Sequence, residues 1–243
     1  MQNIKMKTIV TIPTYNERES IKSLIKNILN LKVPGLEILV IDDNSPDGTW
    51  KVVNNIAKKN KNVHLLLRTT KRGRGYAGKA GFIWALKNKA DYIIEMDADL
   101  SHNPEYIPSF LEKIKGADVV LGSRLVQGGI DRRKSGIRRI ITKLANLYIK
   151  TILGLKVKDC NSGYRCFTGK ALERINPENI FSEGPSIVQE VLFKAHLKGL
   201  KIKEIPIEFT ERKLGKSKLG IKQLYKGYMM VLKAKWLHLS GRI

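Results

Sequence analysis

Cysteine, long apolar runs and acidic residues are all scarce in this sequence of 243 residues. Cys160 and Cys166 are too few for a disulfide framework and lack the Cys-x-x-Cys spacing of a zinc site, so we expect two reduced thiols in a cytosolic protein. No segment reaches the roughly 18 to 20 uncharged apolar residues that a membrane-spanning helix requires. The apolar run after Lys5 and Lys7 is too short for a secretory signal. With 42% hydrophobic residues, the chain is nevertheless expected to fold around a sizeable core.

The scarcity of acids leaves a large positive surplus. The chain has 45 Lys and Arg against 22 Asp and Glu, a formal net charge of +23. Residues 124–150 hold eight basic residues and one acid, and residues 198–243 hold twelve basic residues and three acids. Because the rest of the chain is close to ordinary, the charge marks one surface and not the whole protein.

The first half alternates short apolar runs with longer amphipathic ones, which predicts an α/β fold with a mostly parallel central sheet flanked by helices. The expected strands are Thr8–Ile12, Glu37–Ile41, Val63–Leu67, Tyr92–Met96 and Val119–Leu121. The expected helices are Arg18–Leu29, Thr49–Lys58, Ala77–Asn88 and Glu105–Ile114. Asp47 is expected to cap the second helix, and Pro104 suits the first turn of the fourth.

The second half carries two basic stretches in which apolar residues recur at helical spacing. The first stripe comprises Ile137, Ile140, Ile141, Leu144, Tyr148 and Ile152, and the second comprises Ile221, Tyr225, Tyr228, Leu232, Trp236 and Leu239. Either stripe suits docking onto the sheet, whereas the flanking Lys and Arg favour a helix lying on anionic lipid. We expect one domain over residues 1–219, followed by a basic amphipathic C-terminal helix over residues 220–243.

Polar clusters follow four of the expected strands, at residues 13–17, 42–48, 97–101 and 122–124. In open parallel sheets, ligands bind beyond the carboxyl ends of the strands. The four clusters are therefore expected to converge on one edge of the sheet.

Asp97 and Asp99 should emerge together from the end of a strand. Carboxylates are hard oxygen ligands for Mg²⁺ or Mn²⁺, and such an ion commonly bridges to phosphate oxygens, so a nucleoside diphosphate is the natural partner. Two loop aspartates that act only as turn and cap residues are the alternative. Asp43 and Glu17 fall at the same edge, and uncompensated acids gathered there would need a cation.

Gly73, Gly75 and Gly78 form a G-x-G-x-x-G pattern that imitates a dinucleotide-binding fingerprint. The match is weak, because residues 68–72 separate it from the preceding strand and that strand is the third. A flexible, basic, glycine-rich loop near a phosphate site explains the same residues without a nicotinamide cofactor.

Four cations stand out in the basic stretches: Arg124, Arg138, Arg212 and Lys218. Arg124 follows an expected strand end, and residues 212–218 form a loop able to close over a diphosphate and neutralise charge on a leaving group. Each of them taken alone is equally well read as a solvated surface charge.

The clusters together resemble those of a known family. Pro-Thr-Tyr-Asn-Glu, Asp-Asp-Asn-Ser-Pro-Asp-Gly-Thr, Asp-Ala-Asp-Leu-Ser-His, Gly-Ser-Arg, Ser-Gly-Tyr-Arg and Glu-Arg-x-x-Gly-x-Ser-Lys stand in the order found in dolichol-phosphate mannosyltransferases, which are family 2 inverting glycosyltransferases of the GT-A fold. The resemblance runs from about Ile9 to Gly220.

The resemblance implies a role for each matching position. The positions that hold the nucleoside of GDP-mannose are Pro13, Tyr15, Glu17, Ile41 and Asp43. The metal pair is Asp97 and Asp99, with Ser101 as a further ligand and the Ala98 backbone on the nucleotide. Arg124, Arg212 and Lys218 match residues around the donor phosphates, and Arg138 matches a basic position for the phosphate of the lipid acceptor. The chain departs from the family at 186–191, where a Gln is shifted by one place, and at Thr142, where relatives carry Ser on the acceptor side.

The sequence thus predicts a Mg²⁺- or Mn²⁺-dependent transfer of mannose from GDP-mannose to a dolichyl or polyprenyl phosphate, with Asp99, Arg124 and Arg138 as the catalytic residues. The protein is expected at the cytoplasmic face of the cell membrane, held peripherally by an anionic surface or by a small membrane-anchoring partner. A glucosyl- or N-acetylhexosaminyltransferase that uses a UDP-sugar is the nearest alternative. A basic nucleic-acid-binding module is a more distant one, disfavoured by an aromatic content of 7% and by the lack of a recognised motif.

Overall fold

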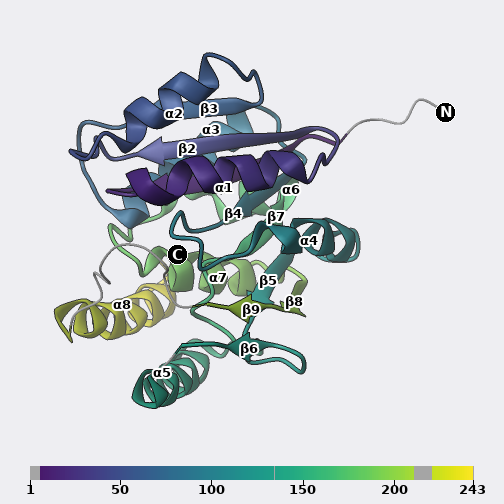
Figure 1. Ribbon diagram of the computed structural model, residues 1–243. Coiled ribbons are helices and arrows are strands. Elements are labelled where there is room, and N and C mark those ends of the chain that lie inside the picture. Colours follow the sequence, from purple (N-terminus) through teal and green to yellow (C-terminus); the bar gives the residue numbers. More distant parts are fainter. Residues whose placement is uncertain (1–5, 134, 211–220, 243) are drawn as a thin grey trace.

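A seven-stranded sheet forms the centre of the molecule (Figure 1), in a computed structural model that describes residues 6–133, 135–210 and 221–242. The strand order is β3-β2-β1-β4-β7-β5-β8. The strands are β1 Thr8–Thr14, β2 Leu36–Asp42, β3 Val63–Leu67, β4 Tyr92–Glu95, β5 Val119–Ser123, β7 Arg165–Thr168 and β8 Ile202–Pro206. Every pairing is parallel except those of β7, which runs antiparallel to both β4 and β5. The predicted α/β fold with a mostly parallel sheet is confirmed.

Helices cover both faces of this sheet. One face carries α1 Arg18–Asn30, α2 Thr49–Ala57 and α4 Ile107–Ile114, and the other carries α3 Arg74–Lys87, α6 Gly169–Ile175 and α7 Ile187–Leu197. Short 3₁₀ turns lie at η1 Pro104–Tyr106 and η2 Pro177–Asn179. A small two-stranded parallel sheet joins β6 Ile130–Asp131 to β9 Glu208–Phe209.

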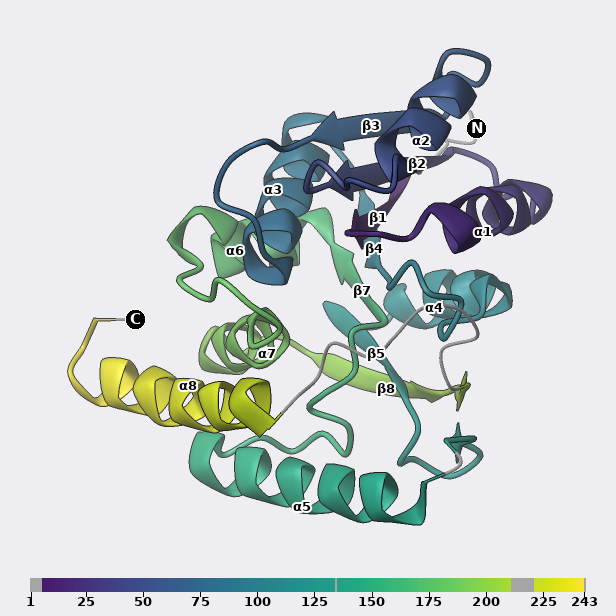
Figure 2. The same ribbon diagram turned by 60° about the vertical axis from the view of Figure 1, so that its left-hand side comes forward.

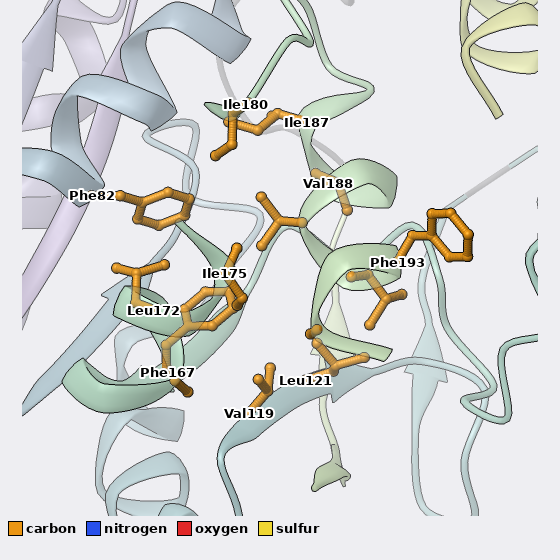
Figure 3. Packing of buried hydrophobic residues seen from close by; sticks show 14 of the residues in the cluster. Phe82, Val119, Leu121, Phe167, Leu172, Ile175, Ile180, Ile187, Val188 and Phe193 are labelled. Carbon is orange, nitrogen blue, oxygen red and sulfur yellow. The ribbon is translucent and has the colours of Figure 1, made fainter. Parts of the chain in front are cut away.

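Alternate residues of each central strand supply the two cores. In β1, Ile9 enters the core under α3, while Val10 and Ile12 enter the core under α1 and α4. Figure 3 shows the first core, where Phe82 of α3 meets Phe167 of β7 edge to face with ring centroids 5.5 Å apart. Burial on both faces explains why these strands read as nearly continuous apolar runs in the sequence.

The five expected strands and four expected helices all exist, with small shifts at their ends. The third helix begins at Arg74 instead of Ala77. Asp47 is not the N-cap of α2: Gly48 holds that position with φ 81°, and Asp47 accepts the Thr49 N–H from one residue further out, at 2.9 Å. Pro104 opens η1, which leads directly into α4.

Two long helices, α5 Gly136–Leu153 and α8 Ile221–Leu239, lie side by side beyond α7, on the flank of the molecule remote from β3 (Figure 2). The Tyr148 hydroxyl donates a hydrogen bond to the Tyr228 carbonyl at 3.2 Å, which ties the two helices together. No helix in the described part of the chain is long and apolar enough to cross a membrane.

The apolar stripe of α5 does not dock onto the sheet along its first turns. Ile149 and Leu153 are buried, whereas Ile137 and Ile140 are 72% and 60% exposed. In α8 a different face, with Val231 and Ala234, is buried, and Trp236 of the predicted stripe is 54% exposed. Docking onto the sheet was therefore the wrong interpretation for these exposed residues.

Candidate active site

The loops after β1, β2 and β4 meet at the carboxyl edge of the sheet, as the sequence predicts. Each of these loops contains a non-glycine residue with positive φ: Asn16 at 58°, Asn44 at 53° and Leu100 at 63°. Asn tolerates this backbone region, but for Leu it costs on the order of 1 kcal/mol or more, and such strain clusters at functional sites. The turn at Leu100 stands between Asp99 and Ser101.

The residues predicted to hold a nucleoside occupy the adjoining ends of β1 and β2. Pro13 lies beside Ile41 in the strand register, and Ile41 turns its side chain into the core against α3. The Glu17 N–H donates to the Thr49 hydroxyl at 3.0 Å, which links this loop to the start of α2. Tyr15 is partly exposed at the same edge.

The acids of the β2 loop are satisfied from within the protein. Asp42 is fully buried and accepts the Ser45 N–H at 2.8 Å and the Thr14 hydroxyl at 2.9 Å. Asp43 accepts the Gly73 N–H at 2.7 Å and pairs with Arg68. Burial raises the pKa of Asp43 above its usual value, although the Gly73 N–H and Arg68 oppose this change. The expectation that Asp43 is uncompensated was wrong, because its partners come from the loop between β3 and α3.

Asp97 and Asp99 differ in their surroundings. The Asp97 side chain is 41% exposed, and its Oδ1 lies 3.7 Å from Arg74 Nη2. Asp99 is buried, and its Oδ1 accepts both the N–H of Ser101 at 3.1 Å and the Ser101 hydroxyl at 2.6 Å. Ala98, between them, is buried in the core under α1 and α4. Ser101, predicted as a metal ligand, thus orients Asp99 in this structure.

His102 also orients the aspartate pair, a role that sequence reasoning missed. Its Nδ1 accepts the backbone N–H of Asp97 at 3.0 Å, and its ring stacks on Tyr164 with centroids 4.9 Å apart. Burial lowers the pKa of His102 in spite of the opposing charges of Asp97 and Asp99, which keeps the ring neutral at pH 7. The histidine in the Asp-Ala-Asp-Leu-Ser-His motif was the signal available.

The aspartate pair fits a divalent metal ion that shares its ligands with a substrate. Within residues 6–133, 135–210 and 221–242, no group of three or more His, Cys, Asp and Glu side chains could hold a metal by itself. Mg²⁺ is usually held by one or two carboxylates together with substrate phosphates and water. Asp97 and Asp99 supply that number of hard oxygen ligands at the sheet edge.

Arg124 stands at the end of β5, and its guanidinium is held by a buried acid. Its Nε and Nη2 donate to the two carboxylate oxygens of Asp159, both at 2.8 Å, and its Cζ lies 4.9 Å from the Phe209 ring centroid. His102 pairs with Phe209 through an isolated β-bridge, so Arg124 is connected to the aspartate loop. Of the other predicted cations, Arg212 and Lys218 lie outside the described residues, as does the side chain of Arg138, whose backbone is in the first turn of α5.

A buried ion chain beneath the site was also missed. Arg165 of β7 is fully buried, and its Nε donates to Glu95 Oε2 at 3.0 Å, while Arg74 Nη1 lies 2.8 Å from Glu95 Oε1. Burial raises the pKa of Glu95, but the charges of Arg165 and Arg74 outweigh it and hold the pKa below the usual value. Glu95 is therefore ionised between Arg165 and Arg74, and this chain of buried charges extends through Arg74 to Asp97.

The glycine pattern serves close packing at the start of α3. A Cβ on Gly75 would lie 2.0 Å from the carbonyl oxygen of Ser182, and the Gly75 N–H donates to the Glu183 carbonyl at 2.9 Å. A Cβ on Gly73 would lie 2.6 Å from the same Glu183 oxygen. These contacts account for the glycines without a dinucleotide.

The chain is similar to known glycosyltransferases. The family model described as "Glycosyl transferase family 2" matches residues 9–176. The undecaprenyl-phosphate mannosyltransferase of Micrococcus luteus is 40% identical over 215 residues, 88% of each chain. The chain belongs to glycosyl transferase family 2. The polyprenol monophosphomannose synthase of Mycolicibacterium smegmatis is 38% identical to this glycosyltransferase, over 98% of this chain and 89% of that one.

The fold of this glycosyltransferase is shared with solved structures of the GT-A type. Glucosyl-3-phosphoglycerate synthase from Mycobacterium tuberculosis, solved with Mn²⁺, UDP and glucosyl-3-phosphoglycerate, superposes with a TM-score of 0.69 at 18% identity, over 96% of this chain and 79% of that one. At that identity the likeness concerns the fold alone.

Proposed function

We propose that this glycosyltransferase moves mannose from GDP-mannose to the phosphate of a polyprenyl or dolichyl phosphate, with inversion at the anomeric carbon. The observation that carries the proposal is the 40% identity to an undecaprenyl-phosphate mannosyltransferase over 88% of this chain. The family match over residues 9–176 includes the loops after β1, β2 and β4. The placement of Asp97 and Asp99 at that edge supports it.

The donor is proposed to bind across the ends of β1, β2 and β4. Pro13, Tyr15, Glu17 and Asp43 would hold the nucleoside, and Ile41, whose side chain is buried against α3, would support them from within the core. Asp97 and Asp99 would hold Mg²⁺ or Mn²⁺, which supplies positive charge to the diphosphate when bound. Arg124, Arg212 and Lys218 would add further positive charge around the donor phosphates.

The chemistry needs no general base. A phosphate monoester is already ionised at neutral pH, so its oxygen attacks the anomeric carbon directly while the bond from that carbon to the GDP oxygen breaks. The new bond joins sugar and lipid phosphate, and GDP leaves with the electron pair. The tasks left to the protein are to align the two substrates and to stabilise the charge on the leaving diphosphate. Arg124 and Arg138 are proposed to align the acceptor phosphate.

The acceptor carries a long apolar chain, and the exposed apolar side chains of α5 and α8 suit a membrane surface. Ile137, Ile140 and Leu144 project from α5 into solvent, next to the exposed Arg139 and Lys143. Such a combination favours binding to anionic lipid. We propose peripheral attachment at the cytoplasmic face of the membrane, with a small membrane protein as an additional anchor.

Incubation of the purified protein with Mg²⁺, polyprenyl phosphate and a panel of labelled sugar nucleotides tests this function. Label should enter the lipid phase from GDP-mannose, and the product should have the opposite anomeric configuration to the donor. Transfer from a UDP-sugar alone would replace the donor assignment. Absence of a lipid-linked sugar with every donor would overturn the function.

A further inference from the structure

Arg74 is an arginine of the site that neither the family resemblance nor the comparisons assign. It is the first residue of α3 and lies within the G-x-G-x-x-G pattern. Its Nη1 is 2.8 Å from Glu95 Oε1, and its Nη2 is 3.7 Å from Asp97 Oδ1. The guanidinium therefore spans from the buried ion chain to one of the two carboxylates proposed to hold the metal.

The charges of Arg165, Glu95 and Arg74 balance only when Asp97 is included. Glu95 offers one oxygen to Arg165 and the other to Arg74, so one negative charge faces two positive ones. Asp97 provides the second negative charge. His102 Nε2 lies 4.0 Å from Asp97 Oδ2, and the charges of Arg124 and Arg165 act on Asp97 from farther off.

The hydrogen-bonding capacity of Arg74 is not used up. Its Nη1 is engaged by Glu95 Oε1 in an ion pair at 2.8 Å, whereas its buried Nη2 has no hydrogen-bond partner among the described residues and lies 3.7 Å from Asp97 Oδ1. Buried donors without acceptors are rare in native proteins, and a bound ion is one of the explanations for those that occur. A diphosphate beside Asp97 would supply acceptor oxygens of the right charge.

The position of the guanidinium is fixed by its surroundings. A Cβ on Gly78 would lie 2.9 Å from Arg74 Nη1, so the glycine leaves the space that the guanidinium occupies. Gly75 in turn holds the first turn of α3 against the backbone of Ser182 and Glu183. The third and second glycines of the pattern thereby place a cation beside the aspartate pair.

From this geometry we propose that Arg74 is a positioning residue. Its guanidinium acts as an internal cation that holds Asp97 and opposes a metal ion bound to the same carboxylate. Two cations that share one carboxylate repel each other, so the metal alone binds weakly. A nucleoside diphosphate adds negative charge for both, and metal and nucleotide therefore strengthen each other's binding. This inference rests on the metal site of the proposed function.

Mn²⁺ binding without nucleotide, followed by the electron paramagnetic resonance signal of the free ion, tests the proposal. Arg74→Gln should bind Mn²⁺ about fivefold more tightly than the wild type, and added GDP should enhance its affinity less. Arg72→Gln removes an equal charge from an exposed neighbour and should change the affinity less than about twofold. An unchanged or weaker affinity in Arg74→Gln overturns the proposal.

Two further measurements separate the possible failures. If the wild type binds no Mn²⁺ even with GDP, or if Asp97→Asn leaves binding unchanged, the metal site of the proposed function is wrong. If Asp97→Asn abolishes binding and Arg74→Gln does not alter it, only the role of Arg74 is wrong. Should Arg74→Gln fail to fold, nuclear magnetic resonance of the wild type offers a second test. The Arg74 Nε–H resonance, assigned by its loss in Arg74→Lys, should shift when Mg²⁺ is added, while the Arg72 resonance should stay in place. A static Arg74 resonance contradicts the proposal.

Discussion

The carboxyl edge of the sheet and the outer layer, formed by α5 and α8, differ in whether their side chains find partners inside the protein. At the edge, charged groups are buried and matched to partners, as Asp42 is to Ser45 and Glu95 is to Arg165. On the outer layer, apolar side chains such as Ile137 and Ile140 stand in solvent. The charged groups of the edge have partners within the chain, whereas the exposed apolar side chains of the outer layer would be buried only by an apolar surface outside the protein. The chain, whose net charge is +23, therefore combines an acidic site at the sheet edge with an exposed apolar surface on α5 and α8.

The largest effect is expected from breaking the buried charge pairing under the edge. Arg165→Met leaves Glu95 with Arg74 alone, and the loss of one partner of a buried ion pair costs about 3 to 5 kcal/mol. Urea unfolding measures this loss. Arg132→Met is the matched control, since Arg132 pairs with Glu208 on the surface, where solvent screens the charges and the pair adds little to stability. Equal losses in the two variants would remove the distinction between the edge and an ordinary surface.

The second prediction concerns the chemistry of the edge. Asp99→Asn should lower the rate of sugar transfer about 100-fold or more, because it removes one of the two proposed metal carboxylates and with it several kcal/mol of charge stabilisation. The fold should persist, since the amide oxygen of Asn still accepts from Ser101. Initial rates with labelled donor measure the effect, and Glu112→Gln, an exposed acid on α4, should keep the full rate. A variant at position 99 with more than half of the wild-type rate would disprove the role of Asp99.

The third prediction addresses the outer layer. Ile140→Asp should weaken binding to anionic phospholipid vesicles about tenfold or more, because burial of one Ile side chain contributes roughly 1.5 to 3 kcal/mol and the aspartate repels the lipid. Sedimentation with vesicles measures the affinity. Met6→Asp makes the same kind of change at the exposed residue before β1, away from this layer, and should bind as the wild type does. Equal weakening by both variants would mean that the outer layer is not the lipid-binding surface.

The last prediction tests how tightly the segment behind the outer layer is packed, and it concerns neither stability nor activity. Burial raises the pKa of the Cys160 thiol to about 12 and also raises that of Cys166. At pH 8 the reactive thiolate is then scarce, and alkylation by iodoacetamide should be at least about a hundredfold slower in the native protein than in urea. Rapid alkylation of Cys160 in the native state would show that the region between α5 and β7 opens.

The sequence predicted the edge better than the ion chain beneath it. Buried parallel strands such as β1 and β2 read as apolar runs, and the polar residues that follow them mark their carboxyl ends, so residues 13–17, 42–48 and 97–101 were placed correctly. The strand β7 was missed because it is short, antiparallel and begins with the charged Arg165. Pairings such as Arg124 with Asp159 depend on tertiary packing, which no spacing along the chain encodes.

The acidic edge and the apolar outer layer are expected to serve one reaction, so sugar transfer should depend on the membrane. The initial rate from GDP-mannose would be measured with a long polyprenyl phosphate in anionic vesicles and with a short, water-soluble prenyl phosphate, for the wild type and Ile140→Asp. Ile140→Asp should lose about tenfold or more of the rate in the vesicles and keep the wild-type rate on the soluble acceptor. Equal rates for the two proteins in vesicles would contradict it.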